Sequence, residues 1–204
     1  MKPDTIGTSE TKLCFLKLIP EKSTVLCAGI GANITPEIDL INQKECLVVA
    51  LDPSYLTKGF LSRTAHIPNF MWLPYALNST ENSFMFYESV DGDLMGSPDK
   101  THSCIIKNKS TSYLVKSLTL DYLINLISNI SYLKIDIEGG EYNVLRNLKD
   151  LSIPQVTIEF HHFASDNFSE EDTKDCLDLF EGFGYKSFDY GDGCEFLFVK
   201  KDLI

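Results

Sequence analysis

Three absences in this sequence each exclude a class of protein. The chain contains no run of about 18 consecutive apolar residues, so no membrane-spanning helix is expected. Basic residues are scarce, since 18 Lys and Arg stand against 29 Asp and Glu and leave a formal net charge of −11. Phosphate contacts need clustered positive charge, so a nucleic-acid-binding surface is not expected either. The N-terminus also lacks the basic-then-apolar order of a secretory signal.

The cysteines form no pair with C-x-x-C spacing, and they are scattered over positions 14, 27, 46, 104, 176 and 194. No cluster of Cys and His has the spacing of zinc ligands, so a zinc site is not expected. At least Cys27 and Cys46 lie in strands predicted to be buried. We therefore expect all six cysteines to be reduced thiols in a cytoplasmic protein.

The order of apolar and polar segments predicts one α/β domain. A chain of 204 residues with 44% hydrophobic and 23% charged residues suits a single globular domain. Strand and helix patterns alternate up to residue 183, which predicts a parallel sheet. We expect a single doubly wound (Rossmann-like) sheet of seven mostly parallel strands, closed by an antiparallel C-terminal hairpin over 185–199. Residues 1–23 are expected to be an N-terminal extension and cover segment, loose up to residue 12, and residues 24–204 the domain.

The first predicted strand runs directly into a glycine turn. Residues 24–28 (TVLCA) form a buried strand pattern, followed by Gly29, Ile30, Gly31, Ala32 and Asn33. Glycines let the backbone approach a ligand closely, and the helix predicted after residue 35 offers free N–H groups at its start. The alternative is a tight strand-to-helix turn that binds nothing.

The second predicted strand, residues 46–52, ends at Asp52, 21 residues after Gly31. This spacing is typical of the acid that accepts hydrogen bonds from ribose hydroxyls. The alternative is a loop Asp that caps the turn at Pro53 and Ser54. Ile34 stands where the dinucleotide-binding fingerprint has its third glycine, so an adenosine with a short charged tail fits better than NAD. An NAD-linked oxidoreductase is therefore disfavoured.

A third strand is predicted over residues 69–77, made irregular by Pro74. Its carboxyl end carries Ala76, Leu77 and Asn78, where an adenine ring would lie. The polar segment 91–108 is long enough to be a lid or a substrate loop, or else a surface loop. Its His102, like His66, is expected at the surface.

The stretch 131–141 (SYLKIDIEGGE) organises the rest of the chain. Apolar side chains alternate with polar ones, and the strand ends in Asp136 and Glu138 before two glycines that open a helix. Ligands of open α/β sheets bind beyond the carboxyl ends of the strands. The alternative is an exposed edge strand. A fifth core strand, residues 155–160, leads to His161 and His162.

Residues 133–141 (LKIDIEGGE) resemble the signature of FkbM-type methyltransferases, which use S-adenosylmethionine. Residues 29–33 resemble the cofactor loop of that family, residues 51–53 (LDP) the end of its second strand, and residues 118–121 the segment before its signature. Residues 158–162 (IEFHH) resemble its fifth strand in one branch. The resemblance covers about residues 24–200. One departure is Cys27, where methyltransferases of this fold usually carry an acid that helps to hold the methionyl end.

The resemblance implies that residues 24–204 are a methyltransferase domain acting on a hydroxyl of a sugar, glycan or natural product. It assigns the cofactor site to the glycine loop, the second strand tip and the third strand end, namely Gly29, Ile30, Gly31, Asn33, Asp52, Pro53, Ala76, Leu77 and Asn78, together with Asp136. Asp136 and Glu138 are expected at the methyl-transfer centre. His161 or His162 is the favoured base because imidazole titrates near neutral pH, with Glu138 or Glu141 next.

Two alternatives stay open at this point. Cys27 would also suit a catalytically weak binding module that has kept the fold and lost cofactor affinity. Separately, a divalent metal ion shared by the carboxylates at 136, 138 and 159 and by His161 is possible, although no metal is assigned. The expected partner is a small-molecule or glycan acceptor, with no nucleic acid and no membrane.

Overall fold

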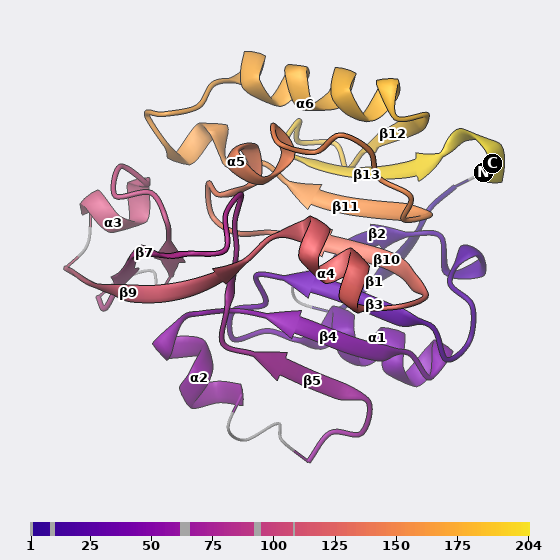
Figure 1. The fold of residues 1–204 in the computed structure, drawn as a ribbon, viewed down its shortest axis with the longest axis horizontal. Coiled ribbons are helices and arrows are strands. Elements are labelled where there is room, and N and C mark those ends of the chain that lie inside the picture. The colour runs from indigo at the N-terminus through magenta and orange to yellow at the C-terminus, as the bar shows by residue number, and fades with distance from the viewer. Residues whose placement is uncertain (1, 9–10, 62–65, 92–94, 108) are drawn as a thin grey trace.

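The computed structural model describes residues 2–8, 11–61, 66–91, 95–107 and 109–204, and its main element is a seven-stranded sheet (Figure 1). From edge to edge the strands are β12 (Tyr185–Asp189), β13 (Glu195–Lys200), β11 (Gln155–Glu159), β10 (Ile130–Ile135), β3 (Thr24–Ala28), β4 (Leu47–Leu51) and β5 (Phe70–Leu73). Strand β13 runs antiparallel to both neighbours, and the other pairs are parallel. The predicted α/β sheet is thus confirmed, including the antiparallel pair at the C-terminal end.

The central strands are mostly apolar because both faces of the sheet are covered. Helices α4 (Leu120–Leu126), α5 (Glu141–Leu145) and α6 (Glu170–Gly182) pack on one face, where Leu26, Leu133 and Phe180 belong to one core. Helix α1 (Thr35–Lys44) and the N-terminal segment cover the other face, with Val25 and Leu40 in a second core. The sheet is therefore doubly wound.

Side chains cap the starts of two helices. The Thr119 side chain accepts a hydrogen bond from the backbone of Tyr122 at the start of α4. Ser169 and Asp172 form a reciprocal capping box at the start of α6. The remaining helical segments are α2 (Tyr55–Leu61), α3 (Ser103–Lys107), η1 (Leu16–Leu18), η2 (His162–Ala164) and η3 (Lys201–Leu203). Within the described ranges, none of the helices has the length and apolar character needed to cross a membrane.

A smaller sheet lies beside the main one and projects from it in Figure 1. Its order is β6 (Ala76–Leu77), β9 (Ser110–Leu118), β7 (Ser83–Ser89) and β8 (Gly96–Ser97). The prediction of one strand over 69–77 is wrong, because β5 and β6 belong to different sheets and Pro74, which has no N–H to donate, separates them. The predicted loop 91–108 contains β8 and α3; residues 92–94 and 108 lie outside the described residues.

The prediction that residues 1–12 are loose is also wrong. Strand β1 (Asp4–Ile6) pairs antiparallel with β2 (Lys12–Cys14), and Ile6 and Cys14 are fully buried. The Leu13 carbonyl accepts a hydrogen bond from the Thr157 hydroxyl at 2.7 Å, which ties β2 to β11. The N-terminal hairpin is therefore part of the layer that covers the second face of the sheet.

Candidate functional site

A pocket of about 620 Å³ lies at the carboxyl ends of the central strands, between them and the small sheet. The three predicted strand tips, Gly29, Asp52 and Asp136, all line it. Most of the other predicted site residues line it too, namely Ile30, Gly31, Asn33, Pro53, Ala76, Leu77 and Glu138. The small sheet adds Phe84, Phe86, Gly96 and Pro98 as the opposite wall. The structure thus brings the glycine loop and the strand-tip carboxylates to one cavity.

The glycine loop fits closely against the neighbouring strand. Gly29 has φ +73°, and a Cβ at this position would lie 1.6 Å from the Asp136 carbonyl oxygen. Gly31 also has a positive φ, +52°, but a Cβ there would meet no atom within 4 Å. Position 29 therefore requires glycine for two reasons, whereas position 31 requires it only for its backbone conformation. Both glycines line the pocket.

Asp52 holds this loop in shape. One carboxylate oxygen accepts hydrogen bonds from the N–H groups of Ile30 at 3.1 Å and Gly31 at 3.0 Å, and the other accepts from Ser54 N–H at 2.9 Å. Burial raises the pKa of Asp52, and the backbone N–H bonds work against that rise. The side chain is only 6% exposed. Asp52 is thus placed at the pocket as predicted, and it also caps the turn, which was the alternative interpretation.

The predicted adenine end is partly at the pocket. Ala76 and Leu77 are buried and line the cavity. Asn78 is not among the lining residues that the structure describes; its side-chain oxygen accepts from Ser79 N–H, and its own N–H donates to the Leu118 carbonyl. Leu56 and Thr57 of α2 line the same region, and the sequence analysis did not single them out.

Asp136 lies between two lysine ammonium groups. Its Oδ2 is 3.4 Å from Lys12 Nζ and 3.6 Å from Lys134 Nζ. Burial alone would raise the pKa of Asp136, but Lys134, Lys12 and His161 outweigh it and hold the pKa at about 2. The carboxylate is therefore ionised at every physiological pH. The Lys134 ammonium also donates to the Gly29 carbonyl at 2.8 Å, so it connects Asp136 to the glycine loop.

Glu138 lies between two imidazole rings. Its Oε2 is 3.2 Å from His161 Nε2 and 3.3 Å from His102 Nε2. Burial raises the pKa of Glu138 above its usual range, although the two histidines oppose this. Glu138 also has φ +55°, an uncommon backbone conformation for a residue other than glycine, and such residues cluster at functional sites. The expectation that His102 lies at the surface is wrong, because His102 is 2% exposed and faces this carboxylate.

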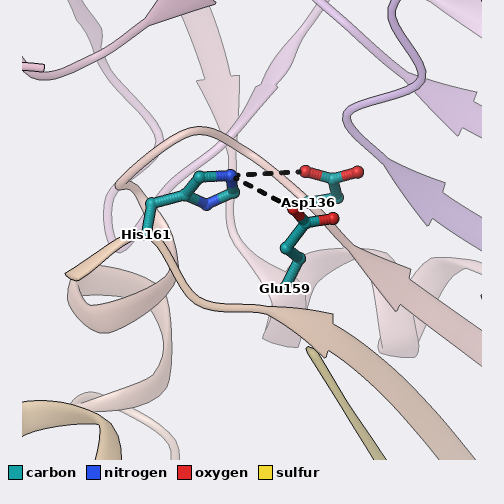
Figure 2. A group of neighbouring side chains, drawn as sticks. All are labelled: Asp136, Glu159 and His161. Carbon is teal, nitrogen blue, oxygen red and sulfur yellow. Dashed lines mark ion pairs between the residues drawn. The ribbon is translucent and has the colours of Figure 1, made fainter. Parts of the chain in front are cut away.

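His161 is surrounded by carboxylates. Its Nδ1 is 3.0 Å from Glu141 Oε1, and its Nε2 is 3.9 Å from both Asp136 Oδ1 and Glu159 Oε1 (Figure 2). Burial would lower the pKa of His161, but the carboxylates at 141, 138 and 136 outweigh burial and raise the pKa to about 10. Glu141 is itself fixed by the N–H groups of Ile137 and Gly139, which donate to its carboxylate. His161 is thus a buried imidazolium at neutral pH.

His162 lies away from this group. It begins the short helix η2, and its Nδ1 is 3.0 Å from Thr173 Oγ1 on α6. The Thr173 hydroxyl is in turn 2.9 Å from the Tyr142 hydroxyl. The two consecutive histidines therefore have different surroundings, and the structure brings only His161 to the strand-tip carboxylates.

Lys12 and Glu195 are site residues that the sequence analysis missed. Lys12 Nζ is 2.5 Å from Glu159 Oε2 and 3.2 Å from Glu195 Oε2, and the lysine is 4% exposed. Lys12 lines the pocket from β2, where no motif surrounds it. Lys134 was also missed, although its position two residues before Asp136 on the same strand was a usable signal.

The predicted set of metal ligands is partly assembled. One ligand atom from each of Asp136, Glu159 and His161 lies within 4.8 Å of the others, close enough to share an ion. Figure 2 shows the side chains of Asp136, just after β10, Glu159 of β11 and His161, after β11, pointing toward one another. Lys12 approaches the same two carboxylates.

Position 27 carries no acid, but an acidic side chain from helix α1 lies near it. Cys27 occupies that position on β3, and the Glu37 side chain of α1 is completely buried near it. Burial raises the pKa values of both groups, and Glu37 adds to the rise at Cys27. Glu37 Oε1 is 3.8 Å from Lys134 Nζ. A carboxylate is therefore present beneath the glycine loop even though position 27 is not acidic.

Comparison with known proteins gives one family match. Residues 23–187 match the sequence model of the family described as the methyltransferase FkbM domain. No curated protein matches the sequence.

Among solved structures, the pre-rRNA processing protein fibrillarin of Methanococcus jannaschii is similar, with 11% identity, 98% of this chain and 84% of that chain covered, and a TM-score of 0.51. Precorrin-6y C5,15-methyltransferase from Geobacter metallireducens GS-15 is 9% identical, with 91% of this chain and 84% of that chain covered, and has a TM-score of 0.47. At 11% identity the likeness to fibrillarin concerns the fold alone.

Proposed function

Since the chain belongs to the FkbM methyltransferase domain family, we propose that it transfers a methyl group from its cofactor to a hydroxyl of a sugar, glycan or natural-product acceptor. The cofactor of this methyltransferase is S-adenosylmethionine. One observation carries the proposal: the glycine loop, the ribose-type acid Asp52 and the strand-tip carboxylates Asp136 and Glu138 line a single cavity.

The residues present suit the cofactor. The part of the pocket beside Gly29 and Gly31 would hold the methionyl tail, Asp52 the ribose, and Ala76 and Leu77 the adenine edge. Bound S-adenosylmethionine supplies an electrophilic methyl group on a positively charged sulfur, and the ionised Asp136 favours a positive charge at this edge of the sheet.

We assign the base to Glu138 in place of His161 or His162. A base must be unprotonated before transfer, and His161, with its pKa near 10, is already protonated. Glu138 lines the pocket, and burial raises its pKa, which makes its carboxylate a stronger base. It would take the proton that the acceptor hydroxyl gives up on methylation, while the methyl–sulfur bond of the cofactor would break and leave a neutral thioether. His161 and His102 hold Glu138 in position, and Asp136 supplies the negative charge beside the centre.

The charges that line the pocket favour a neutral or cationic acceptor. Its described lining holds four carboxylates, those of Asp52, Asp136, Glu138 and Glu159, against the two ammonium groups of Lys12 and Lys134. A phosphate or carboxylate near the transfer centre would be repelled by this excess of negative charge. Neutral hydroxyl compounds fit, whereas nucleic acid does not, which agrees with the formal charge of −11.

The free cysteines support a proposal for the cellular compartment of the protein. The five cysteines that the structure describes as free are Cys14, Cys27, Cys46, Cys176 and Cys194. Free thiols persist in a reducing compartment, so we place the enzyme in the cytoplasm, away from membranes.

Cofactor binding is tested first, by calorimetry and by thermal unfolding with S-adenosylmethionine. At a hundredfold excess over Kd, a ligand that binds only the folded state adds about 2.7 kcal/mol of stability. Saturable 1:1 binding with such a shift is expected. No binding and no shift would support the alternative, a binding module that has lost its cofactor, which Cys27 motivates.

Asp136→Asn tests the transfer centre. Lys12 keeps Glu159 and Lys134 keeps Glu37 as partners, so the variant should fold. Turnover should fall about 10²–10³-fold because the charge next to the transfer centre is lost. The assay is label transfer from methyl-labelled S-adenosylmethionine to a panel of neutral polyols, amines and acidic compounds, with the exposed Asp121→Asn as control. Full activity of the Asp136 variant would remove this residue from the centre.

A further inference from the structure

The ammonium of Lys12 is surrounded by the carboxylates of three strand ends. Its Nζ lies 2.5 Å from Glu159 Oε2, 3.2 Å from Glu195 Oε2 and 3.4 Å from Asp136 Oδ2. These acids come from β11, β13 and the end of β10, so a single cation joins three adjacent strands of the sheet. Removing an ammonium group from water is costly unless carboxylates surround it, and here they do.

Two of these carboxylates bridge between Lys12 and His161. Asp136 has Oδ2 toward Lys12 and Oδ1 toward His161, and Glu159 has Oε2 toward Lys12 and Oε1 toward His161. The Lys12 ammonium thus occupies a central position among hard oxygen atoms. Carboxylate oxygens in this arrangement are also the ligands that Mg²⁺ and Mn²⁺ prefer.

The backbone holds Lys12 firmly in this position. The next residue, Leu13, accepts a hydrogen bond from Thr157 at 2.7 Å. Phe15 donates its N–H to Gln155 Oε1 at 2.7 Å, and its carbonyl accepts from Gln155 Nε2 at 3.1 Å. Strand β2 is therefore attached to β11 on the C-terminal side of Lys12, and its pairing with β1 holds the same strand from the other edge.

We propose that Lys12 is the resident cation of this centre, a positioning residue that fills the place a divalent metal ion would otherwise take. Lys12 and Glu195 both lie outside residues 23–187, the part that matches the family, so the terminal segments complete the site. The inference concerns the same pocket as the proposed methyl transfer. Its test measures metal binding and requires no turnover, so each of the two proposals can fail without the other.

The test is calorimetric titration of the full-length protein with MnCl₂ near neutral pH, for the wild type and five variants, one of them the single variant Glu159→Gln. Lys12→Met removes the ammonium and keeps most of the side-chain volume, whereas Lys12→Arg keeps a positive charge. The double variant Lys12→Met/Glu159→Gln removes a metal ligand as well. Lys17→Met is the matched control, because Lys17 is an exposed lysine of the same segment.

The Lys12→Met variant should bind one Mn²⁺ at least 100-fold more tightly than the wild type, and the double variant should lose this gain. The Lys12→Arg and Lys17→Met variants should behave like the wild type. A folded Lys12→Met variant that gains no Mn²⁺ affinity would overturn the proposal.

The wild type decides the question if Lys12→Met does not fold. Suppose that the wild type binds Mn²⁺ saturably at 1:1 and that this binding weakens at least tenfold in Glu159→Gln. A metal ion, and not Lys12, would then be the cation of the centre, which would overturn the proposal. If the wild type and the folded Lys12→Arg variant show no such binding, the proposal is supported.

Discussion

The two sides of the pocket are built in different ways. The cofactor side, made of residues 29–33, Asp52 and β6, is shaped by backbone N–H groups, such as those of Ile30 and Gly31, that donate to the Asp52 carboxylate. The charged side, made of Lys12, Asp136, Glu138, Glu159 and His161, consists of side chains from β2, β11 and the segments that follow β10 and β11. The first side depends on backbone conformation, and the second depends on a balance of buried charges. Mutations should therefore affect the two sides differently.

The largest effect is expected from Gly29→Ala on the cofactor side. The new methyl group would lie 1.6 Å from the Asp136 carbonyl oxygen, at a φ of +73° that disfavours alanine. We expect a loss of about 3 kcal/mol or more in the free energy of unfolding, together with loss of S-adenosylmethionine binding. Urea unfolding and calorimetry measure the two effects.

Gly31→Ala is the matched control for that change. It has a φ of +52° but open space around the position, so only the backbone cost of about 1–2 kcal/mol applies. If both alanine variants lose the same stability, the close contact between the glycine loop and β10 does not matter.

The next largest effect is on the charged side, where His161 should make the free energy of unfolding depend on pH. The folded-state pKa of His161, about 10, lies above its ordinary value of 6.5. The stabilisation from His161 is therefore fully present below pH 6.5 and is lost as the pH rises through 10. Relative to His161→Gln, the wild type should lose stability on the order of a few kcal/mol across this interval.

Urea unfolding at pH 6, 8 and 10 measures this difference. The exposed His66→Gln serves as the control and should follow the wild type at each pH. A constant difference between wild type and His161→Gln from pH 6 to 10 would mean that His161 is not held as an imidazolium by its carboxylate neighbours.

Asp52→Ala should have a smaller effect, mainly on cofactor affinity. The ribose hydroxyls would lose their charged acceptor, and one hydrogen bond to a charged group contributes about 1.5–3 kcal/mol. We expect the Kd for S-adenosylmethionine to rise about 10- to 100-fold by calorimetry. Asp52→Asn keeps one acceptor oxygen, so its Kd should lie between those of the wild type and Asp52→Ala. Unchanged affinity in both variants would show that the ribose is held elsewhere.

The smallest effect is expected from His162→Gln, which tests where the charged side ends. The variant loses one hydrogen bond to Thr173, about 1 kcal/mol, and leaves the pocket lining intact. Methyl transfer should stay within about threefold of wild type, a change of less than 1 kcal/mol in the activation barrier. A tenfold fall in turnover at unchanged cofactor affinity would show that His162 does take part in methyl transfer.

The outcome of the sequence predictions follows the same division. The GxG turn and the acid at position 52 are local patterns, and the structure has them where the sequence places them. Predictions that concerned surroundings were less successful. His102 looked like a surface residue of a polar loop, and the hairpin of β1 and β2 looked like a loose tail. Neither segment has a periodic pattern long enough to indicate burial.

The amino-acid sequence by itself determined the α/β alternation, the order of the strand tips and the family signature at 133–141, because helix, strand and turn preferences act over a few neighbouring residues. Only the tertiary structure decided which charges face one another. It placed Lys12 against Glu159, 147 residues away in the chain, and gave His161 and His162 different neighbours. Electrostatic interactions depend on distance in space and on burial, and both are properties of the packed chain.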